Sequence, residues 1–316
     1  MENSKKFDIY QDVTNRIITL LKEGTAPWQQ PWKGGRNMLP TNGSTNTPYS
    51  GVNILLLWAA GFQQSKWLTF KQVKFLKGSV KKGAKATRIV RVIPMEREEK
   101  DCDGNPVIDE ETGEIKMRHF SVLKYFYVYN VEQCEGLPEK LYDDVEYSDS
   151  ERKTSEDVLK KVRSIAKGMG IEVKLGDSAY YRPWVDDIHM PNIKSFESDE
   201  TYAATLLHEL THATGHQERL NRTGITCSAP FGSRAYANEE LIAEMGSAFA
   251  SAHLGINVLF QHIEQHTAYL KSWLQVLSED KKFIFRASGE ARKATEFLLS
   301  NLSVSEEGQP KSEAAA

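Results

Sequence analysis

One segment restricts the fold of this chain more than any other: TYAATLLHELTHATGH, residues 201–216. Apolar residues before the histidines and Gly215 after them predict an amphipathic helix that ends near this glycine. On a helix, His208 and His212 differ by only about 40° of rotation, so both imidazoles can bind one metal ion. Glu209, next to the first histidine, can reach a bound water and serve as general base. The segment therefore predicts a helix that carries a metal site.

The metal site needs a third protein ligand, and several candidates are open. We favour Glu240, which lies 28 residues after His212 (240 − 212) on the next predicted helix. Glu239 is its neighbour on that helix and the nearest alternative. His216 follows His212 by four residues, but the glycine between them is expected to bend the chain first. Glu218 stands where the metzincin pattern, which this segment otherwise resembles, has a histidine, and this weakens that alternative.

The sequence NEELIAE around Glu240 resembles the gluzincin arrangement of metallopeptidases, in which a second helix supplies a glutamate. The resemblance implies that Glu240 binds the metal and that Glu244 hydrogen-bonds a ligating histidine and fixes its tautomer. Two imidazoles and one carboxylate accept Zn²⁺, which we expect first, but also Mn²⁺ or Co²⁺. A metal site with such a glutamate favours peptide hydrolysis, whereas phosphodiester cleavage more often uses paired metals and several carboxylates.

Charge is distributed unevenly along the chain. The net charge is −3, but residues 1–135 carry +5 and residues 136–316 carry −8. Between Gly24 and Met95 there are eleven Lys and Arg residues, no Asp or Glu, and four of the six tryptophans. Lysine and arginine side chains neutralise phosphates, while aromatic side chains stack on unpaired bases. The first half is therefore predicted to bind single-stranded nucleic acid.

The residues expected at this surface are basic or aromatic side chains of the acid-free stretch: Trp28, Trp32, Lys33, Arg36, Tyr49, Lys66, Trp67, Lys71, Lys74, Lys81, Lys82 and Lys85. For Trp28 and Trp32, in APWQQPW, anchoring in the core is the alternative. Trp58 follows the apolar residues Ile54–Leu57 and is expected to lie on a helix and face the hydrophobic core.

Hydrophobic periodicity predicts an α+β chain with two domains, the second mainly helical. We expect domains at 1–135 and 156–303, an acidic linker at 136–155 and a disordered tail at 304–316. In the first domain we expect helices at 7–23, 51–60 and 67–78, strands at 86–94 and 120–129, and an exposed hairpin loop at 96–114. In the second we expect helices at 156–167, 201–216, 238–254, 260–277 and 280–302, and strands at 171–175 and within 179–191, one of which could hold an extended substrate.

Spaced motifs in both halves resemble the ArdC antirestriction family. PWQQPW, PTNGSTNTPYSGVNILLLW and WLTFKQVKFLKGSVKKGAKAT are similar to its N-terminal domain, and LLHELTHATGHQERLNR and YANEELIAEMGSAFA to its zincin-like C-terminal domain. The resemblance implies a protein of a conjugative plasmid or related mobile element that binds single-stranded DNA and protects incoming DNA from restriction. A restriction enzyme or a DNA-bound protein could be the substrate of its peptidase. Alternatively, DNA binding alone protects, and the zincin domain is structural or proteolytically inactive.

Membrane association and export are not expected. No apolar run approaches the roughly 18 to 20 residues that cross a bilayer, and the N-terminus lacks the pattern of an export signal. The three cysteines are far apart and lack CxxC spacing, which suits a reducing compartment. We therefore expect a location in the bacterial cytoplasm.

Overall fold

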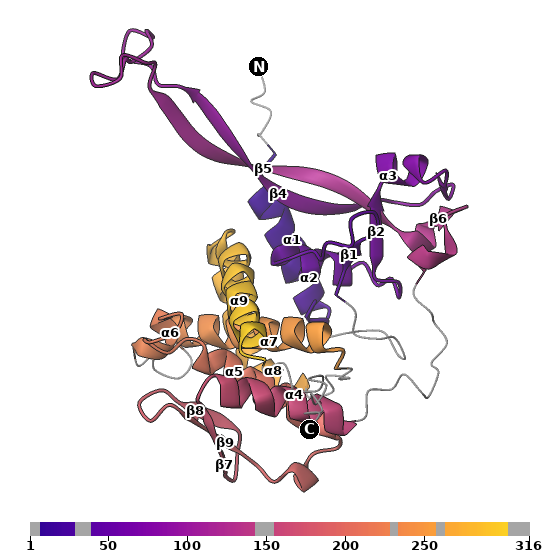
Figure 1. The fold of residues 1–316 in the computed structure, drawn as a ribbon, viewed down its shortest axis with the longest axis vertical. Coiled ribbons are helices and arrows are strands. Elements are labelled where there is room, and N and C mark those ends of the chain that lie inside the picture. Colours follow the sequence, from indigo (N-terminus) through magenta and orange to yellow (C-terminus); the bar gives the residue numbers. More distant parts are fainter. Residues whose placement is uncertain (1–6, 29–38, 143–154, 228–232, 257–262, 303–316) are drawn as a thin grey trace, which may run out of the picture.

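The computed structural model describes residues 7–28, 39–142, 155–227, 233–256 and 263–302 (Figure 1). The chain is α+β, and its C-terminal part is mainly helical, as the sequence predicted. Its elements are α1 (Ile9–Lys22), β1 (Thr41–Asn42), α2 (Val52–Trp58), β2 (Lys66–Thr69), α3 (Phe70–Phe75), β3 (Ser79–Val80), β4 (Thr87–Glu98), β5 (Met117–Asn130), β6 (Cys134–Glu135), α4 (Ser155–Gly168), β7 (Glu172–Leu175), β8 (Tyr180–Arg182), β9 (Asp187–Met190), α5 (Asp199–Ala213), α6 (Thr223–Thr226), α7 (Arg234–Leu254), α8 (Ile263–Glu279) and α9 (Phe283–Ser300). In the described ranges, no helix is both long and apolar enough to cross a membrane.

The first half is built on a sheet of order β1-β2-β5-β4. Strand β1 is parallel to β2, and the other neighbours are antiparallel. Asn53 of α2 covers part of the open edge of β4: its side-chain amide donates to the carbonyl of Val90 at 2.8 Å and accepts from the amide of Val90 at 2.8 Å. This side chain takes the place of a neighbouring strand and anchors α2 to the sheet.

The predicted helix over residues 67–78 is wrong at its start. Trp67 and Leu68 are the buried centre of strand β2 and pair with β5. The helix begins only at Phe70, where Thr69 and Gln72 form a reciprocal capping box. The apolar face of this segment is therefore shared between a strand and a short helix, which the helical pattern alone does not reveal.

Strands β4 and β5 form a long hairpin that projects from the body (Figure 1). Both strands extend further than predicted, so the connecting loop comprises residues 99–116 in place of 96–114. The loop is exposed, as expected, and contains the acidic turns around Asp101 and Asp109.

In the second half, the small sheet has the order β7-β9-β8, with β9 parallel to β7 and antiparallel to β8. Ile188 and Met190 of β9 are buried in a cluster with apolar residues of α4 and α5. Helix α5 also packs against α7 and α9. This arrangement places the predicted metal-site helix between the sheet and the C-terminal helices.

One large hydrophobic cluster spans both halves of the chain. Apolar residues of α1, α2 and β4 form a continuous cluster with residues of α7, α8 and α9. The rings of Trp58 and Phe249 are 5.8 Å apart, and those of Trp28 and Trp273 are 5.6 Å apart. Figure 1 shows α1 and α2 between the first sheet and the C-terminal helices. The predicted boundary at 136–155 therefore falls between two stretches that share this cluster, while each also has clusters of its own.

Candidate metal centre

Helix α5 supplies two histidines to one side of the site. Ser198 caps the helix by accepting a hydrogen bond from the amide of Thr201 at 3.2 Å. Most of the helix is buried. His208 and His212 lie one turn apart and face α7, which carries Glu240.

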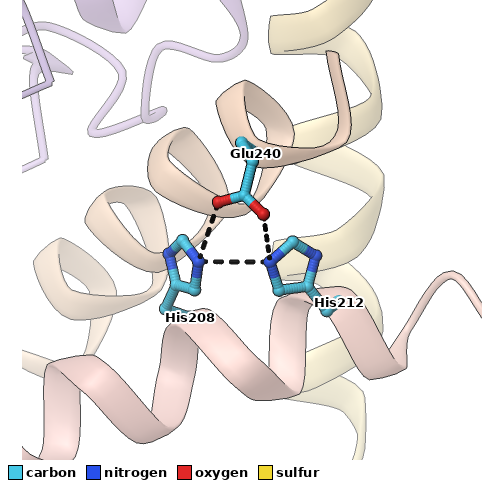
Figure 2. Close-up of side chains that lie close together, drawn as sticks. All are labelled: His208, His212 and Glu240. Carbon is cyan, nitrogen blue, oxygen red and sulfur yellow. Dashed lines mark hydrogen bonds and ion pairs between the residues drawn. The ribbon is translucent and has the colours of Figure 1, made fainter. Parts of the chain in front are cut away.

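The three side chains converge as a ligand set would (Figure 2). The Nε2 atoms of His208 and His212 are 3.1 Å apart. The carboxylate oxygens of Glu240 lie 3.7 Å from Nε2 of His208 and 3.6 Å from Nε2 of His212. Tetrahedral ligands about 2.0–2.1 Å from one metal ion are separated by about 3.3–3.4 Å. The donor atoms therefore fit a divalent metal between them.

Each histidine has a carboxylate on its other ring nitrogen. Nδ1 of His208 lies 3.8 Å from Oε1 of Glu244, and Nδ1 of His212 lies 3.4 Å from Oε1 of Glu239. Such outer carboxylates fix the ring orientation and leave Nε2 for the metal. Glu244 was anticipated in this position, whereas the contact of Glu239 with His212 was not.

Glu239 also forms a buried ion pair with Arg222. The guanidinium donates from its Nη2 to Oε1 at 2.6 Å and from its Nε to Oε2 at 3.0 Å, and both side chains are about 5% exposed. Arg222 also donates to the carbonyl of Thr211 at 2.7 Å, within the HELTH segment. Glu239 thus contacts Arg222 and the Nδ1 side of His212, and it lies outside the cluster of His208, His212 and Glu240.

The other two alternatives lie past the end of α5. The backbone amide of Glu218 donates to Nδ1 of His216 at 3.3 Å, and Glu218 is exposed. Neither residue joins the three-residue cluster that the described part of the chain contains.

The carboxylates around the site stabilise positive charge there. Burial lowers the pKa of His208, but Glu240, Glu244 and Glu209 outweigh it and raise this pKa to about 10. Burial raises the pKa of Glu240, while His208 and His212 lower it further, to about 2. A proton on the imidazole is thus stabilised by carboxylates that could equally balance a divalent cation.

Comparisons with known proteins agree with this geometry. A family described as the N-terminal domain of anti-restriction factor ArdC matches residues 7–129, and one described as a zincin-like metallopeptidase matches residues 160–290. The metal-free crystal structure of the antirestriction protein ArdC from plasmid R388 is 36% identical to this chain. The match covers 94% of this chain and 98% of that chain, with a TM-score of 0.73. The chain belongs to the ArdC family.

Other relatives extend this family. The Mn(II)-bound structure of the R388 ArdC protein is 33% identical, covers 95% of this chain and all of that chain, and has a TM-score of 0.70. Protein y4eC of Sinorhizobium fredii is 33% identical over 92% of this chain and 91% of its own length. The DNA primase TraC of Escherichia coli is 38% identical over 93% of this chain, but this chain spans only 27% of that primase.

Two further groups border the candidate metal centre. Glu209 is buried, and its charge contributes to the raised pKa of His208. Tyr236 lies one turn before Glu240 on α7, and its hydroxyl is 3.2 Å from that of Tyr269. A hydrogen bond from Tyr236 also contributes to the lowered pKa of Glu240. The sequence alone gave no reason to prefer this tyrosine.

Strand β8, at the edge of its sheet, is tied to the end of α5. Arg219 donates to the carbonyl of Ala213 at 2.7 Å and to the hydroxyl of Tyr181 at 3.1 Å, and it is paired with Asp186. Tyr181 in turn donates to Asp186 at 2.6 Å. This network holds the edge strand in position beside the helix of the two histidines.

The predicted nucleic-acid residues have mixed outcomes. Trp28 and Trp67 are 1% and 2% exposed, so their prediction as base-stacking residues is wrong; for Trp28 the alternative, anchoring in the core, is confirmed. Tyr49 is half-buried, and its ring packs against the cluster around Trp67. Trp58 is buried, as predicted. Trp32, Lys33 and Arg36 lie outside the described residues.

The predicted lysines and two unpredicted aromatics lie at the surface. Lys71, Lys74, Lys81, Lys82 and Lys85 are exposed, and Lys66 is half-buried. Phe70 and Phe75 of α3 are 51% and 84% exposed, and the amine of Lys74 lies 5.7 Å from the ring centre of Phe70. The composition of this stretch correctly indicated exposed aromatics among lysines, but it pointed to the tryptophans.

Proposed function

We propose that this chain is an antirestriction protein of a mobile element, which binds single-stranded DNA and cleaves a peptide bond at its metal centre in the bacterial cytoplasm. Membership of the ArdC family supports the antirestriction role. The observation that carries the catalytic part is the pair of histidines whose Nε2 atoms meet 3.1 Å apart while separate carboxylates face both Nδ1 atoms.

The metal would be held by His208, His212 and Glu240, with Zn²⁺ as our first assignment and Mn²⁺ as the alternative. A bound divalent cation supplies Lewis acidity that polarises a carbonyl and makes water more acidic. Glu209 accepts the proton of the attacking water and delivers it to the leaving amine. Glu244 and Glu239 keep both imidazoles oriented.

The substrate would bind as an extended peptide along β8. This strand is at the sheet edge, and Arg219 fixes it to α5. Main-chain hydrogen bonds to an edge strand are a common mode of peptide recognition. Tyr236, beside Glu240, would give up its hydrogen bond to that carboxylate and donate to the carbonyl oxygen as negative charge develops there.

Single-stranded DNA would bind across α3 and the following lysines. Phe75 offers a free ring for base stacking, and Lys71, Lys81 and Lys82 offer cations for phosphates. These residues replace Trp28 and Trp67 in the proposed surface. A Phe75→Ala variant is expected to weaken single-strand affinity by roughly 10-fold, since stacking contributes about 1–3 kcal/mol per base.

A Glu209→Gln variant tests the catalytic part. It keeps all three ligands, so we expect unchanged metal content and melting temperature but loss of protection when DNA enters a restricting host. Glu218→Gln, which changes an exposed carboxylate outside the cluster, is the matched control and should protect normally.

A second candidate is DNA protection with a structural metal. It is favoured by the position of α7, whose opposite face belongs to the core shared by both halves. Under this alternative, Glu209→Gln protects as well as wild type, whereas variants of the α3 surface do not. Full protection by Glu209→Gln would exclude the catalytic proposal.

A further inference from the structure

The β4–β5 hairpin separates its charges between its two faces. Alternate residues of a strand share a face, so the register places Arg91 opposite Lys124 and Arg97 opposite Arg118 on one of them. This face carries no carboxylate between Ile89 and Arg97 or between Arg118 and Phe126. The acids Glu96 and Glu98 lie on the opposite face, where Glu96 pairs with His119 at 3.5 Å.

We call the face with these two cationic pairs the basic face. An apolar centre lies between the two pairs. It consists of the cross-strand pairs Ile93 with Val122 and Met95 with Phe120. Met95 is 40% exposed. None of these four residues belongs to a hydrophobic cluster of the described part of the chain.

The cationic pairs are costly without a partner of opposite charge. Like charges directly opposite each other on neighbouring strands destabilise a sheet. Across the described ranges, none of the four cations forms an ion pair with a carboxylate. A polyanion that contacts this face would relieve the repulsion and cover the apolar centre.

We propose that the basic face of the β4–β5 hairpin is a contact surface for duplex DNA, separate from the single-strand surface at α3. A two-stranded ribbon fits the major groove, which is about 12 Å wide. The two cationic pairs are six residues apart, or about 20 Å, which is enough to reach the phosphate backbones on both sides of that groove.

The aromatic ring of this face argues for duplex over single strand. The guanidinium of Arg97 lies over the ring of Phe120, 5.4 Å from its centre, and occupies the face that an unpaired base would need. The acidic loop 99–116 repels phosphates. The contact is therefore confined to the paired part of the hairpin, residues 91–97 and 118–124.

The test uses the full-length protein and compares two double variants that each remove two positive charges from the hairpin. Arg97→Gln with Arg118→Gln removes them from the basic face, and Lys100→Gln with Lys116→Gln removes them from the acidic loop. Binding to a labelled duplex of about 20 base pairs and to one of its strands is titrated over a range of salt concentrations.

We expect the first variant to bind duplex at least 10-fold more weakly at low salt and to lower the slope of log K against log salt by about two. The second should change duplex affinity less than twofold. Equal losses in both variants, an absence of wild-type duplex binding, or a loss confined to the single strand would each overturn the proposal.

Arg118→Glu separates binding from folding. It places opposite charges across from each other, so the melting temperature should stay the same or rise while duplex binding is lost. Retained duplex affinity in this folded variant would also overturn the proposal. Phe75→Ala should leave duplex affinity unchanged, so the outcome does not depend on the single-strand surface.

Discussion

Gly246 of α7 lies directly against Thr211 of α5. A Cβ atom at position 246 would stand 3.1 Å from Oγ1 and only 2.6 Å from Cγ2 of Thr211, and the second distance is closer than real Cβ atoms approach. Thr211 is held in place because its hydroxyl donates to the carbonyl of Leu207 at 2.7 Å. This close approach sets the distance between the helix of the two histidines and the helix of Glu240.

Gly246→Ala should therefore push α5 and α7 apart. We expect a loss of about 1–3 kcal/mol in the free energy of unfolding, typical of overpacking, and weaker metal binding because Glu240 moves away from the histidines. Chemical denaturation and a metal titration against a competing chelator would measure the two effects.

Gly289→Ala on α9 is the matched control, since a Cβ atom there meets nothing within 4 Å. That change should be neutral or stabilise the protein by up to about 1 kcal/mol, because alanine favours helices over glycine. Equal behaviour of the two variants would show that helix propensity, and not the contact with Thr211, determines the outcome.

The outer carboxylates should tune metal affinity. Glu239→Gln and Glu244→Gln are each expected to lower the affinity by about 10- to 100-fold. Glu239→Gln should also lower the free energy of unfolding of the metal-free protein by about 3–5 kcal/mol, because Arg222 keeps its buried charge without its partner. Glu244→Gln lacks this second effect, so calorimetric melting separates the two variants. Melting curves that coincide would argue against the buried pair with Arg222.

Asp187 should give the small sheet a dependence on pH. Hydrogen bonds from Arg182, together with one from Lys174, hold the pKa of Asp187 well below its usual range. A lowered folded-state pKa contributes stability above the unfolded value of about 3.9, and this contribution is lost as the pH falls through the folded value.

Asp187→Asn should thus lower the melting temperature at pH 7 by about 2–4 °C and flatten the decline in stability between pH 5 and pH 2. Glu172→Gln changes the other, exposed partner of Lys174 and should have a smaller effect. An unchanged decline in stability between pH 5 and pH 2 in Asp187→Asn would contradict this account.

The shared core predicts that the first half does not fold alone. A fragment of residues 1–135 would expose the faces of α1 and α2 that pack on α7, α8 and α9. We expect no cooperative thermal transition in the fragment and a single transition in the full chain, measured by circular dichroism. Cooperative melting of the fragment would show that the first half has a sufficient core of its own.

The helical spacing of His208 and His212 was enough to predict that the two imidazoles meet, whereas Glu240 was predicted from the resemblance of its segment to the gluzincin arrangement. The two histidines are one helical turn apart on α5, and Glu240 lies on α7. Most helices and the long hairpin also follow from periodicity and turn residues. These features depend on neighbours in the sequence, so the sequence displays them directly.

Features that depend on distant residues were missed. Arg222 gave no sign of its buried pairing with Glu239, because arginine is usually a surface residue and its partner lies 17 positions away. Trp67 was assigned to the surface, and Trp28 was left open between surface and core, because the surrounding stretch is basic. Trp28 packs on Trp273, and Trp67 lies in a buried cluster with Val128 of β5. Phe75 was left out of the predicted binding residues, since an exposed phenylalanine cannot be told from a core one by type alone.

The continuous core also limits how the gene for such a protein can be reshuffled. A crossover within the segment that joins the halves would combine α1 and α2 from one parent with α7, α8 and α9 from another. The ring at position 58 would then pack, in place of Phe249, against a residue that had not evolved with it. Such hybrids would inherit mismatched packing even where both parents are sound. Selection would then favour the transfer of both halves together, as a single heritable module.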